Sequence, residues 1–318
     1  MVPALVARTN AISPTGNELK PLTMLSLAPL RYRNIFAEYG GPVAKVESSR
    51  VTVRGQPMIQ ANAWLRPDLA RKKKEVLFSS ADGSGTHAVP SIARHKAISE
   101  AMERWAFHAT VRSERAAEFG FDLDPTSNGM SAFPGLLRRQ ARRAAVLEAI
   151  ERHCIFAWWE GRAEGRLFDT DWPGVSAVAI NGPFGGVAVI VFSRTEWGGY
   201  AYGHAAEESF GAACERAIVE LARHEWLLRS VWLARVAGET VAPTHLLERR
   251  CLFFASDEGH ALFLGRVAAR ATGPALRPEI ICDRDIPGPW DEFATVWRFA
   301  LRPVSDGFIA GGERYFFL

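Results

Sequence analysis

The sequence predicts an α+β protein, and three features of its 318 residues lead to this fold class. Alternating apolar and polar residues at 43–63, and apolar runs at 175–192, predict strands. Apolar residues at helical spacing predict long helices over about 91–110, 135–159 and 205–237. No Gly/Ser-rich or Pro-rich linker separates the helices from the strands. We therefore expect a single domain over 1–318, with helices packed on mixed sheets.

Composition excludes several classes of protein. Hydrophobic residues make up 48% of the chain and charged residues 23%, which is ordinary for a globular protein and not for a disordered or collagen-like one. The net charge of +3 is too near neutral to indicate nucleic acid or a membrane surface as partner. No secretory signal or long apolar run is evident, so we expect a cytoplasmic protein.

The remaining segments give weaker expectations. Residues 1–45 contain five prolines and no sustained period, which predicts an irregular lead-in. Arg71–Lys74 is a basic run for which we favour a solvated loop, and 78–86 is rich in small residues and predicts another loop. The C-terminal part alternates turns with short apolar runs at 251–254, 261–264, 279–282 and 293–301.

A repeated motif carries the chemical information. The pattern A-x-x-E-A-x-E-R occurs at 97–104 and again at 145–152, each time within a predicted helix. Because residues three apart lie on one helix face, each copy presents two carboxylates with an arginine beside the second. If the two helices face each other, four carboxylates surround one space.

Such a cluster needs cations, because unpaired carboxylates repel one another. Carboxylate oxygens are ligands for Mg²⁺ or Ca²⁺, Mg²⁺ also takes phosphate oxygens, and arginine binds phosphate in a bidentate manner. The sequence therefore predicts a magnesium–nucleotide site built from helix faces. No phosphate-binding G-x-x-x-x-G-K-[ST] loop is present. The alternative for either single copy is an exposed charged face stabilised by pairs four residues apart.

Beyond this motif, the sequence from about Phe78 to Tyr315 resembles the YcaO family, ATP-dependent enzymes that activate peptide backbone amides. In that family a glycine-flanked segment, here Gly83-Ser-Gly85, precedes the first acidic helix. A Ser-Asn-Gly segment, here at 127–129, precedes the second. Further on, a glycine and an R-A-x-x-E helix are matched by Gly203 and by Arg216 to Glu220.

The resemblance implies a single YcaO-type ATP-binding domain that uses ATP and Mg²⁺ as cofactors. It implies metal binding by five glutamates, which are Glu100, Glu103, Glu148, Glu151 and Glu220. It implies nucleotide or phosphate binding by five further residues, which are Ser84, Arg104, Gln140, Arg152 and Arg216. No residue is assigned a catalytic role.

The activity implied is cyclodehydration of Cys, Ser or Thr to thiazoline or oxazoline in a ribosomally made precursor peptide, as in bacteriocin maturation. Thioamidation and amidine formation are alternative reactions of the same family. Because no fused peptide-recognition module is visible in 318 residues, we expect a separate recognition protein as partner. A flavin dehydrogenase in the same complex and an oligomeric state are further expectations.

The chain departs from the family pattern at four points. Ser84 stands where lysine is usual, Gln140 where an acidic residue is usual, and Arg223 where glutamine is usual. The sequence also ends in Gly-Gly-Glu-Arg-Tyr-Phe-Phe-Leu rather than in a proline-rich tail. These departures keep a second hypothesis open, a non-catalytic YcaO-fold subunit that serves as scaffold in a peptide-modifying complex.

Overall fold

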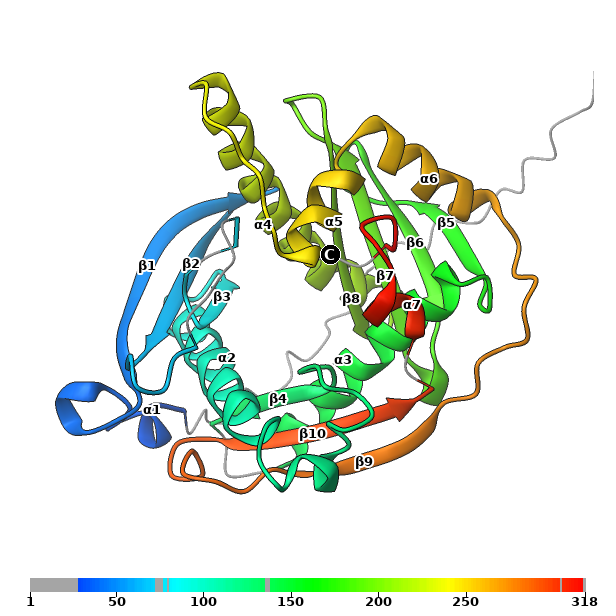
Figure 1. Cartoon of the computed structure of the whole chain (residues 1–318). Coiled ribbons are helices and arrows are strands. Elements are labelled where there is room, and N and C mark those ends of the chain that lie inside the picture. The colour runs from blue at the N-terminus through cyan, green and yellow to red at the C-terminus, as the bar shows by residue number, and fades with distance from the viewer. Residues whose placement is uncertain (1–27, 72–76, 79, 135–137, 304, 317–318) are drawn as a thin grey trace, which may run out of the picture.

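The computed structural model describes residues 28–71, 77–78, 80–134, 138–303 and 305–316 (Figure 1). Within these ranges the chain is built from helices and antiparallel sheets, which confirms the α+β class. Much of the lead-in and of the basic run, 1–27 and 72–74, lies outside the described residues. The described remainder of the lead-in holds two short helical segments, α1 (Ala28–Arg31) and η1 (Ala37–Tyr39).

The described strands form three sheets. The first has the order β1 (Val43–Val53), β2 (Gln56–Leu65), β3 (Gly83–His87); the second β4 (Met130–Phe133), β10 (Thr295–Arg302), β9 (Glu279–Asp285); the third β5 (Gly165–Asp169), β6 (Val175–Asn181), β7 (Val187–Arg194), β8 (Tyr200–Glu207). Every pair of these strands is antiparallel, so the prediction of mixed sheets is wrong for them. Most neighbours follow each other closely in the chain, whereas parallel pairing needs a long crossover.

The predicted long helices are present, with one correction at the start of the third. Helices α2 (Pro90–Thr110) and α3 (Arg138–Trp159) match the predicted ranges where these are described. Helix α4 (Phe210–Val236) begins later than predicted, because residues 200–207 pair in β8. Ser209 then caps α4 by accepting a hydrogen bond from the backbone N–H of Ala212 (3.4 Å).

The apolar runs near the C-terminus divide between helices and strands. Those at 251–254 and 261–264 belong to α5 (Leu246–Phe254) and α6 (Asp257–Ala268). Those at 279–282 and 293–301 contribute to β9 and β10. The other helical segments described are η2 (Ala116–Phe119), η3 (Pro183–Gly185) and α7 (Asp306–Ala310). None of the described helices is both long and apolar enough to cross a bilayer.

The three long helices connect the sheets around the middle of the molecule (Figure 1). Helix α2 packs on β2 and β3, and α4 packs on β7 and β8. Helix α3 packs on β4 and β10 and also contacts β7 and β8, so it joins the second sheet to the third. The acidic motifs of α2 and α3 are thereby carried on two helices that border the same central region.

Small residues let α2 lie directly on β3. Ala97 and Ala101 are fully buried against Gly83 and Gly85. A Cβ atom on Gly83 would lie 2.1 Å from the carbonyl oxygen of Ala97, so the two backbones can approach this closely only at a glycine. The prediction of a loop over 78–86 is wrong for its last residues, because 83–87 form β3.

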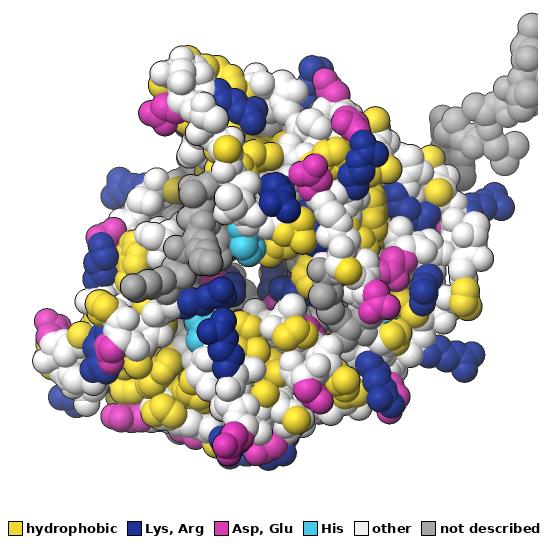
Figure 2. Space-filling model, viewed as in Figure 1, with side chains coloured by type: hydrophobic (Ala, Val, Ile, Leu, Met, Phe, Trp, Pro, Cys, Tyr) yellow, Lys and Arg dark blue, Asp and Glu magenta, His cyan; other side chains and the backbone are white. Residues whose placement is uncertain are grey.

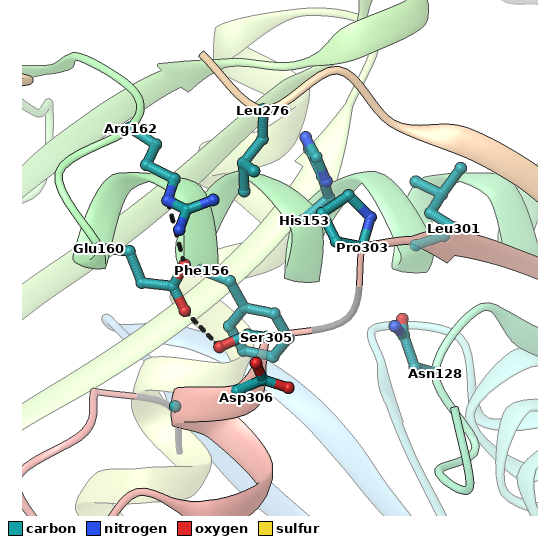
Figure 3. A pocket seen from close by; sticks show the side chains of 12 residues that line it. Asn128, His153, Phe156, Glu160, Arg162, Leu276, Leu301, Pro303, Ser305 and Asp306 are labelled. Carbon is teal, nitrogen blue, oxygen red and sulfur yellow. Dashed lines mark hydrogen bonds and ion pairs between the residues drawn. The ribbon is translucent and has the colours of Figure 1, made fainter. Parts of the chain in front are cut away.

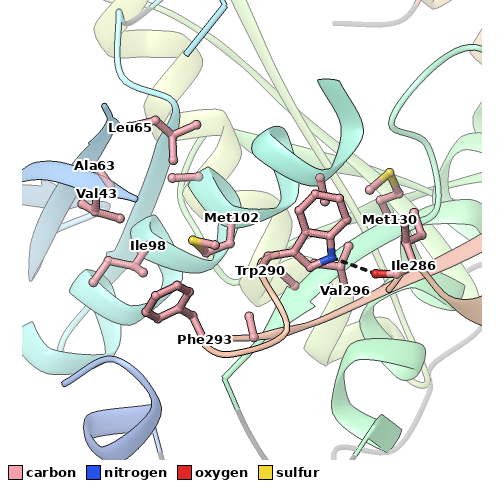
Figure 4. Close-up of a cluster of buried hydrophobic side chains, with 14 of the residues drawn as sticks. Val43, Ala63, Leu65, Ile98, Met102, Met130, Ile286, Trp290, Phe293 and Val296 are labelled. Carbon is pink, nitrogen blue, oxygen red and sulfur yellow. Dashed lines mark hydrogen bonds between the residues drawn. The ribbon is translucent and has the colours of Figure 1, made fainter. Parts of the chain in front are cut away.

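The largest core cluster ties α2 to two sheets (Figure 4). Ile98 and Met102 on α2 pack between the first sheet and the segment that leads into β10. Trp290 in that segment is buried and donates its indole N–H to the carbonyl oxygen of Ile286 (2.7 Å), so its polar atom is satisfied. The position of α2 is thus fixed from both sides.

A buried arginine organises the segment before β4. Arg298 on β10 is fully buried, and its Nη2 lies 3.3 Å from a carboxylate oxygen of Asp124, which is also buried. The guanidinium donates further hydrogen bonds to backbone carbonyl oxygens, those of Phe119, Asp124, Thr126 and Asn128. A buried charge is tolerated when its partners satisfy it in this way. The turn at 124–129 is therefore held against β10.

We predict that Arg298→Met destabilises the protein by about 3–5 kcal/mol, because it leaves the Asp124 carboxylate buried without its cation. The matched control is Arg302→Met on the same strand, where Arg302 pairs with Glu279 in solvent. That change should shift the free energy of unfolding by less than about 1 kcal/mol. Urea unfolding followed by circular dichroism measures both, and equal effects would contradict the role given to Arg298.

Candidate functional site

A cleft of about 900 Å³ lies between the first sheet, α2 and α4. Its charged lining residues are Lys96, Glu100, Glu103, Glu207, Glu215, Arg216, Glu220 and Arg223. Its apolar lining residues include Val53, Met58, Phe133, Trp172 and Ile218. Figure 2 shows a hollow near the middle of the molecule, between the first sheet and β8, with Lys and Arg side chains at its edge.

The predicted site residues divide into two groups. Five line the cleft, namely Ser84, Glu100, Glu103, Arg216 and Glu220. The other five are Arg104 on α2 and Gln140, Glu148, Glu151 and Arg152 on α3. Arg104, Glu148 and Arg152 of the second group connect to the first through electrostatic contacts with Glu103.

Glu100 is held in place by the first sheet. The backbone N–H of Ser84 donates to one carboxylate oxygen of Glu100 (2.8 Å), and Nη2 of Arg104 lies 3.7 Å from the other. The Ser84 hydroxyl donates to the side chain of Asn62 (2.8 Å). Both donors of Ser84 are therefore used inside the protein, and one of them positions Glu100.

Glu103 on α2 and Glu148 on α3 are close enough for their carboxylates to repel each other. Burial raises the pKa of the Glu103 carboxyl well above its ordinary value, and repulsion from Glu148 and Glu100 raises it further. Glu103 forms no hydrogen bond or ion pair with any described residue. Burial also raises the pKa of Glu148, to about 7, with Arg152 opposing the shift and Glu151 adding to it.

The second sheet fixes the orientation of Glu148. The backbone N–H of Met130, the first residue of β4, donates to a carboxylate oxygen of Glu148 (3.1 Å). The preceding Gly129 has φ +61°, and a Cβ atom there would lie 1.8 Å from the carbonyl oxygen of Phe299. The Ser-Asn-Gly segment therefore requires glycine for a tight turn that presents this N–H.

Glu151 has a separate partner. Its carboxylate oxygen lies 2.7 Å from Nδ1 of His204 on β8, and both side chains are only 15% exposed. Of the four carboxylates of the repeated motif, Glu151 is thus the one that pairs with a side chain of the third sheet. Sequence reasoning did not find His204, since no spacing relates it to the motif.

Two arginines accompany these carboxylates. Arg104 is attracted to Glu103 and Glu148 as well as to Glu100. Nη2 of Arg152 lies 3.9 Å from a Glu148 oxygen, and the side chain is 17% exposed. Both guanidinium groups therefore lie beside the point where the motif carboxylates of α2 and α3 meet.

Gln140 has an unsatisfied atom. Its side-chain carbonyl oxygen is buried and has no hydrogen-bond partner among the described residues. It lies two turns before Glu148 on α3. An orphaned buried acceptor costs free energy, so it marks a place where a cation or a donor would be stabilised.

Ion pairs connect α4 to the cleft. Arg216 donates to Glu207 at the end of β8 (2.8 Å), which also accepts from Arg143 of α3 (2.8 Å). Arg223 donates to Glu220 (3.0 Å), so this predicted metal ligand is already paired with a cation. Glu207 and Arg143 were not found by sequence reasoning, because tertiary structure alone brings them to Arg216.

The residues present fit a divalent cation at Glu103 and Glu148. The two carboxylates repel each other, and the buried side-chain oxygen of Gln140 lies on α3, the helix of Glu148. Carboxylate and amide oxygens are the hard donors that Mg²⁺ prefers. In the described part of the chain, however, no three His, Cys, Asp or Glu side chains are arranged closely enough to hold a metal ion. Glu100, Glu148 and Glu151 are instead hydrogen-bonded within the protein.

A second pocket of about 300 Å³ lies on α3 near α7 (Figure 3). His153 and Phe156 contribute from α3, and Glu160, the residue that follows this helix, accepts a hydrogen bond from the hydroxyl of Ser305. Burial lowers the pKa of His153. None of the predicted site residues lines this pocket.

The last described residues pack in the core beside this pocket. Phe316 is fully buried against Trp158 and Phe254, and the hydroxyl of Tyr315 donates to Glu160 (3.0 Å). Neither residue lines the cleft.

Comparison with known proteins gives a structural likeness. No protein-family model and no curated protein matches the sequence. Two solved structures of the E. coli microcin synthetase McbBCD complex, one of them with pro-MccB17 bound, each contain a chain of similar fold. In both cases the TM-score is 0.50 and the identity 11%, over 80% of this chain and 86% of the other. At this identity the likeness concerns the fold.

The raised pKa values predict how stability depends on pH. A carboxyl whose pKa is higher in the folded than in the unfolded chain takes up protons on folding, so its contribution is present at low pH and lost as the pH rises. For Glu148 the loss falls between its ordinary pKa of 4.5 and about 7. We expect Glu148→Gln to flatten the decline of unfolding free energy over this range, as measured by urea unfolding in EDTA. Parallel curves for both proteins would contradict the assignment.

Proposed function

We propose that this chain is a YcaO-type domain that binds ATP and Mg²⁺ and activates backbone amides of a ribosomally made precursor peptide. The observation that carries the proposal is the approach of Glu103 and Glu148 from two helices, with Arg104 and Arg152 beside them. Like charges brought together without a proton or cation are costly, and a bound divalent ion removes that cost. The motif resemblance and the fold of the microcin synthetase chain support the same conclusion.

The cleft suits a nucleotide in size and lining. Pockets of about 300–1,000 Å³ are typical for small ligands, and this one is within that range. One wall carries apolar side chains such as Met58 and Trp172, which suit a base, and the opposite charges of α2 and α4 suit phosphates and their counterion.

Glu103 and Glu148 would hold the metal ion, with Glu100 beside them. Bound there, Mg²⁺ would neutralise the triphosphate and align its terminal phosphoryl group. Arg104, Arg152 and Arg216 would contact phosphate oxygens, and Gln140 would offer its buried oxygen to the ion or its water. The N–H groups of Ser84 and Met130 keep two of these carboxylates oriented.

The reaction proposed is cyclodehydration. A Cys, Ser or Thr side chain gives up its proton and adds to the preceding amide carbon, and the amide oxygen takes the terminal phosphoryl group of ATP as the bond to ADP breaks. The carbon–oxygen bond then breaks with phosphate as leaving group, and loss of the amide proton gives the azoline. Thioamidation or amidine formation would use the same activation with another nucleophile.

A scaffold subunit without catalytic activity is the second candidate. Arg223 favours it, because its guanidinium already occupies Glu220, one of the predicted metal ligands. In either case we propose that the chain works in a complex with a separate peptide-recognition protein. A flavin dehydrogenase in that complex, an oligomeric state and a cytoplasmic location are part of the same proposal.

The test is a peptide modification assay. The protein, the companion proteins encoded beside it and the candidate precursor are incubated with ATP and Mg²⁺, and the peptide mass is followed. Loss of one water per modified residue indicates cyclodehydration, whereas exchange of oxygen for sulfur indicates thioamidation. We expect Glu103→Gln to abolish the change, because one of the two carboxylates that hold the metal ion is lost.

The matched control is Glu118→Gln, which alters an exposed carboxylate on η2. It should leave product formation as in the wild type. If wild type and Glu103→Gln modify the peptide equally, the proposed site is wrong. If neither modifies it although wild type binds ATP with Mg²⁺, the scaffold is the better description.

A further inference from the structure

Lys96 is a cation of the cleft to which the proposed function assigns no role. It lies on α2 one turn before Glu100 and two turns before Glu103, so all three side chains follow one face of the helix. The side chain is accessible from the cleft. It forms no hydrogen bond or ion pair with any described residue.

The two arginines of the same wall come from α4. Arg216 and Arg223 line the cleft together with Lys96, and each has a carboxylate partner, Glu207 for the first and Glu220 for the second. Lys96 has none of its own and is repelled by both arginines, with Glu220 attracting it less strongly. Three cations therefore gather in the cleft, and the two carboxylates nearest the arginines, Glu207 and Glu220, are already engaged by them.

Strand β3 brings two of these cations side by side. A Cβ atom on Gly85 would lie 2.6 Å from Cβ of Lys96, which means that the stem of Lys96 rests directly on this strand. Arg223 reaches the adjacent residue, because its Nε donates to the hydroxyl of Thr86 (3.3 Å). Lys96 and Arg223 thus flank consecutive residues of β3, the strand that begins with Gly83-Ser-Gly85.

Such an arrangement is unfavourable in the free protein unless an anion joins it. Like charges held on two neighbouring helices, α2 and α4, repel one another, and a polyanion converts that repulsion into attraction. Lysine binds phosphate as a compact point charge, whereas arginine binds it as a planar fork. The site therefore combines both modes of phosphate recognition.

We propose that Lys96, together with Arg216 and Arg223, binds the phosphate chain of a nucleoside triphosphate. The inference rests on the proposed function and adds two residues, Lys96 and Arg223, to the phosphate contacts. The phosphate chain of the nucleotide would then run along α2, with some of its oxygens at Lys96 and its metal-bound end at Glu103.

The test is calorimetric binding of inorganic tripolyphosphate, ATP and adenosine, each with EDTA and, in a second series, with Mg²⁺. Loss of a charge-assisted contact in Lys96→Met should weaken tripolyphosphate and ATP binding by about tenfold or more. Adenosine binding should not change. Lys96→Arg, which keeps the charge, should retain most of the affinity.

Arg229→Met is the matched control, since Arg229 is an exposed cation of α4 that does not line the cleft. Thermal unfolding provides an independent readout. Removal of a repelled charge should leave the free Lys96→Met protein at least as stable as wild type, while tripolyphosphate should raise the melting temperature of wild type more than that of the variant.

The outcomes separate the inference from the function on which it rests. If wild type binds ATP with Mg²⁺ and Lys96→Met binds it equally well, the role of Lys96 is overturned and the proposed function stands. If wild type binds tripolyphosphate through Lys96 but shows no Mg²⁺-dependent ATP binding, the phosphate site stands and the proposed function fails. If wild type binds none of the phosphate probes, both are overturned.

Discussion

The repulsion between Glu103 and Glu148 is the constraint on which the rest of the site depends. Burial and their mutual approach raise the pKa of Glu103, and burial raises that of Glu148, so the free protein favours partly protonated carboxyls. A fold maintained only for stability gains nothing from such a pair. A fold that must hold a divalent ion requires it, because hard cations are bound by converging carboxylates.

The architecture supplies this convergence by fixing each helix from a different side. Glycines in β3 let α2 approach the first sheet, and the Ser84 N–H then orients Glu100. Arg298 holds the turn before β4, from which the Met130 N–H reaches Glu148. Residues far from the carboxylates in sequence therefore determine their geometry. Mutations at these positions should affect ligand binding as well as stability.

The sequence was informative where the chemistry repeats at helical spacing. The paired glutamates of α2 and α3 could be placed on common helix faces because a helix has a fixed period. The same reasoning, extended by one turn, reaches Lys96, which lies four residues before Glu100. The helix ends and the strand at 83–87 were harder to predict. At 83–87 the reason is that small residues are compatible with both a loop and a closely packed strand.

Contacts between distant segments could not be predicted from one sequence. His204 pairs with Glu151, and Glu207 joins Arg143 to Arg216, only because β8 lies beside both α3 and α4. No spacing or motif links these residues. The fold class thus followed from local patterns, whereas the partners of the charged groups followed from the packing of whole elements.

Electron paramagnetic resonance of Mn²⁺, used in place of Mg²⁺, tests the central claim most directly. If Glu103 and Glu148 hold the metal of a metal–nucleotide complex, wild type should bind Mn²⁺ in the presence of ATP. Because ATP itself binds Mn²⁺, the reference is protein-free Mn²⁺–ATP: wild type should change its spectrum, and Glu103→Gln and Glu148→Gln should each leave it as without protein. Equal Mn²⁺ binding by wild type and both variants would contradict the account.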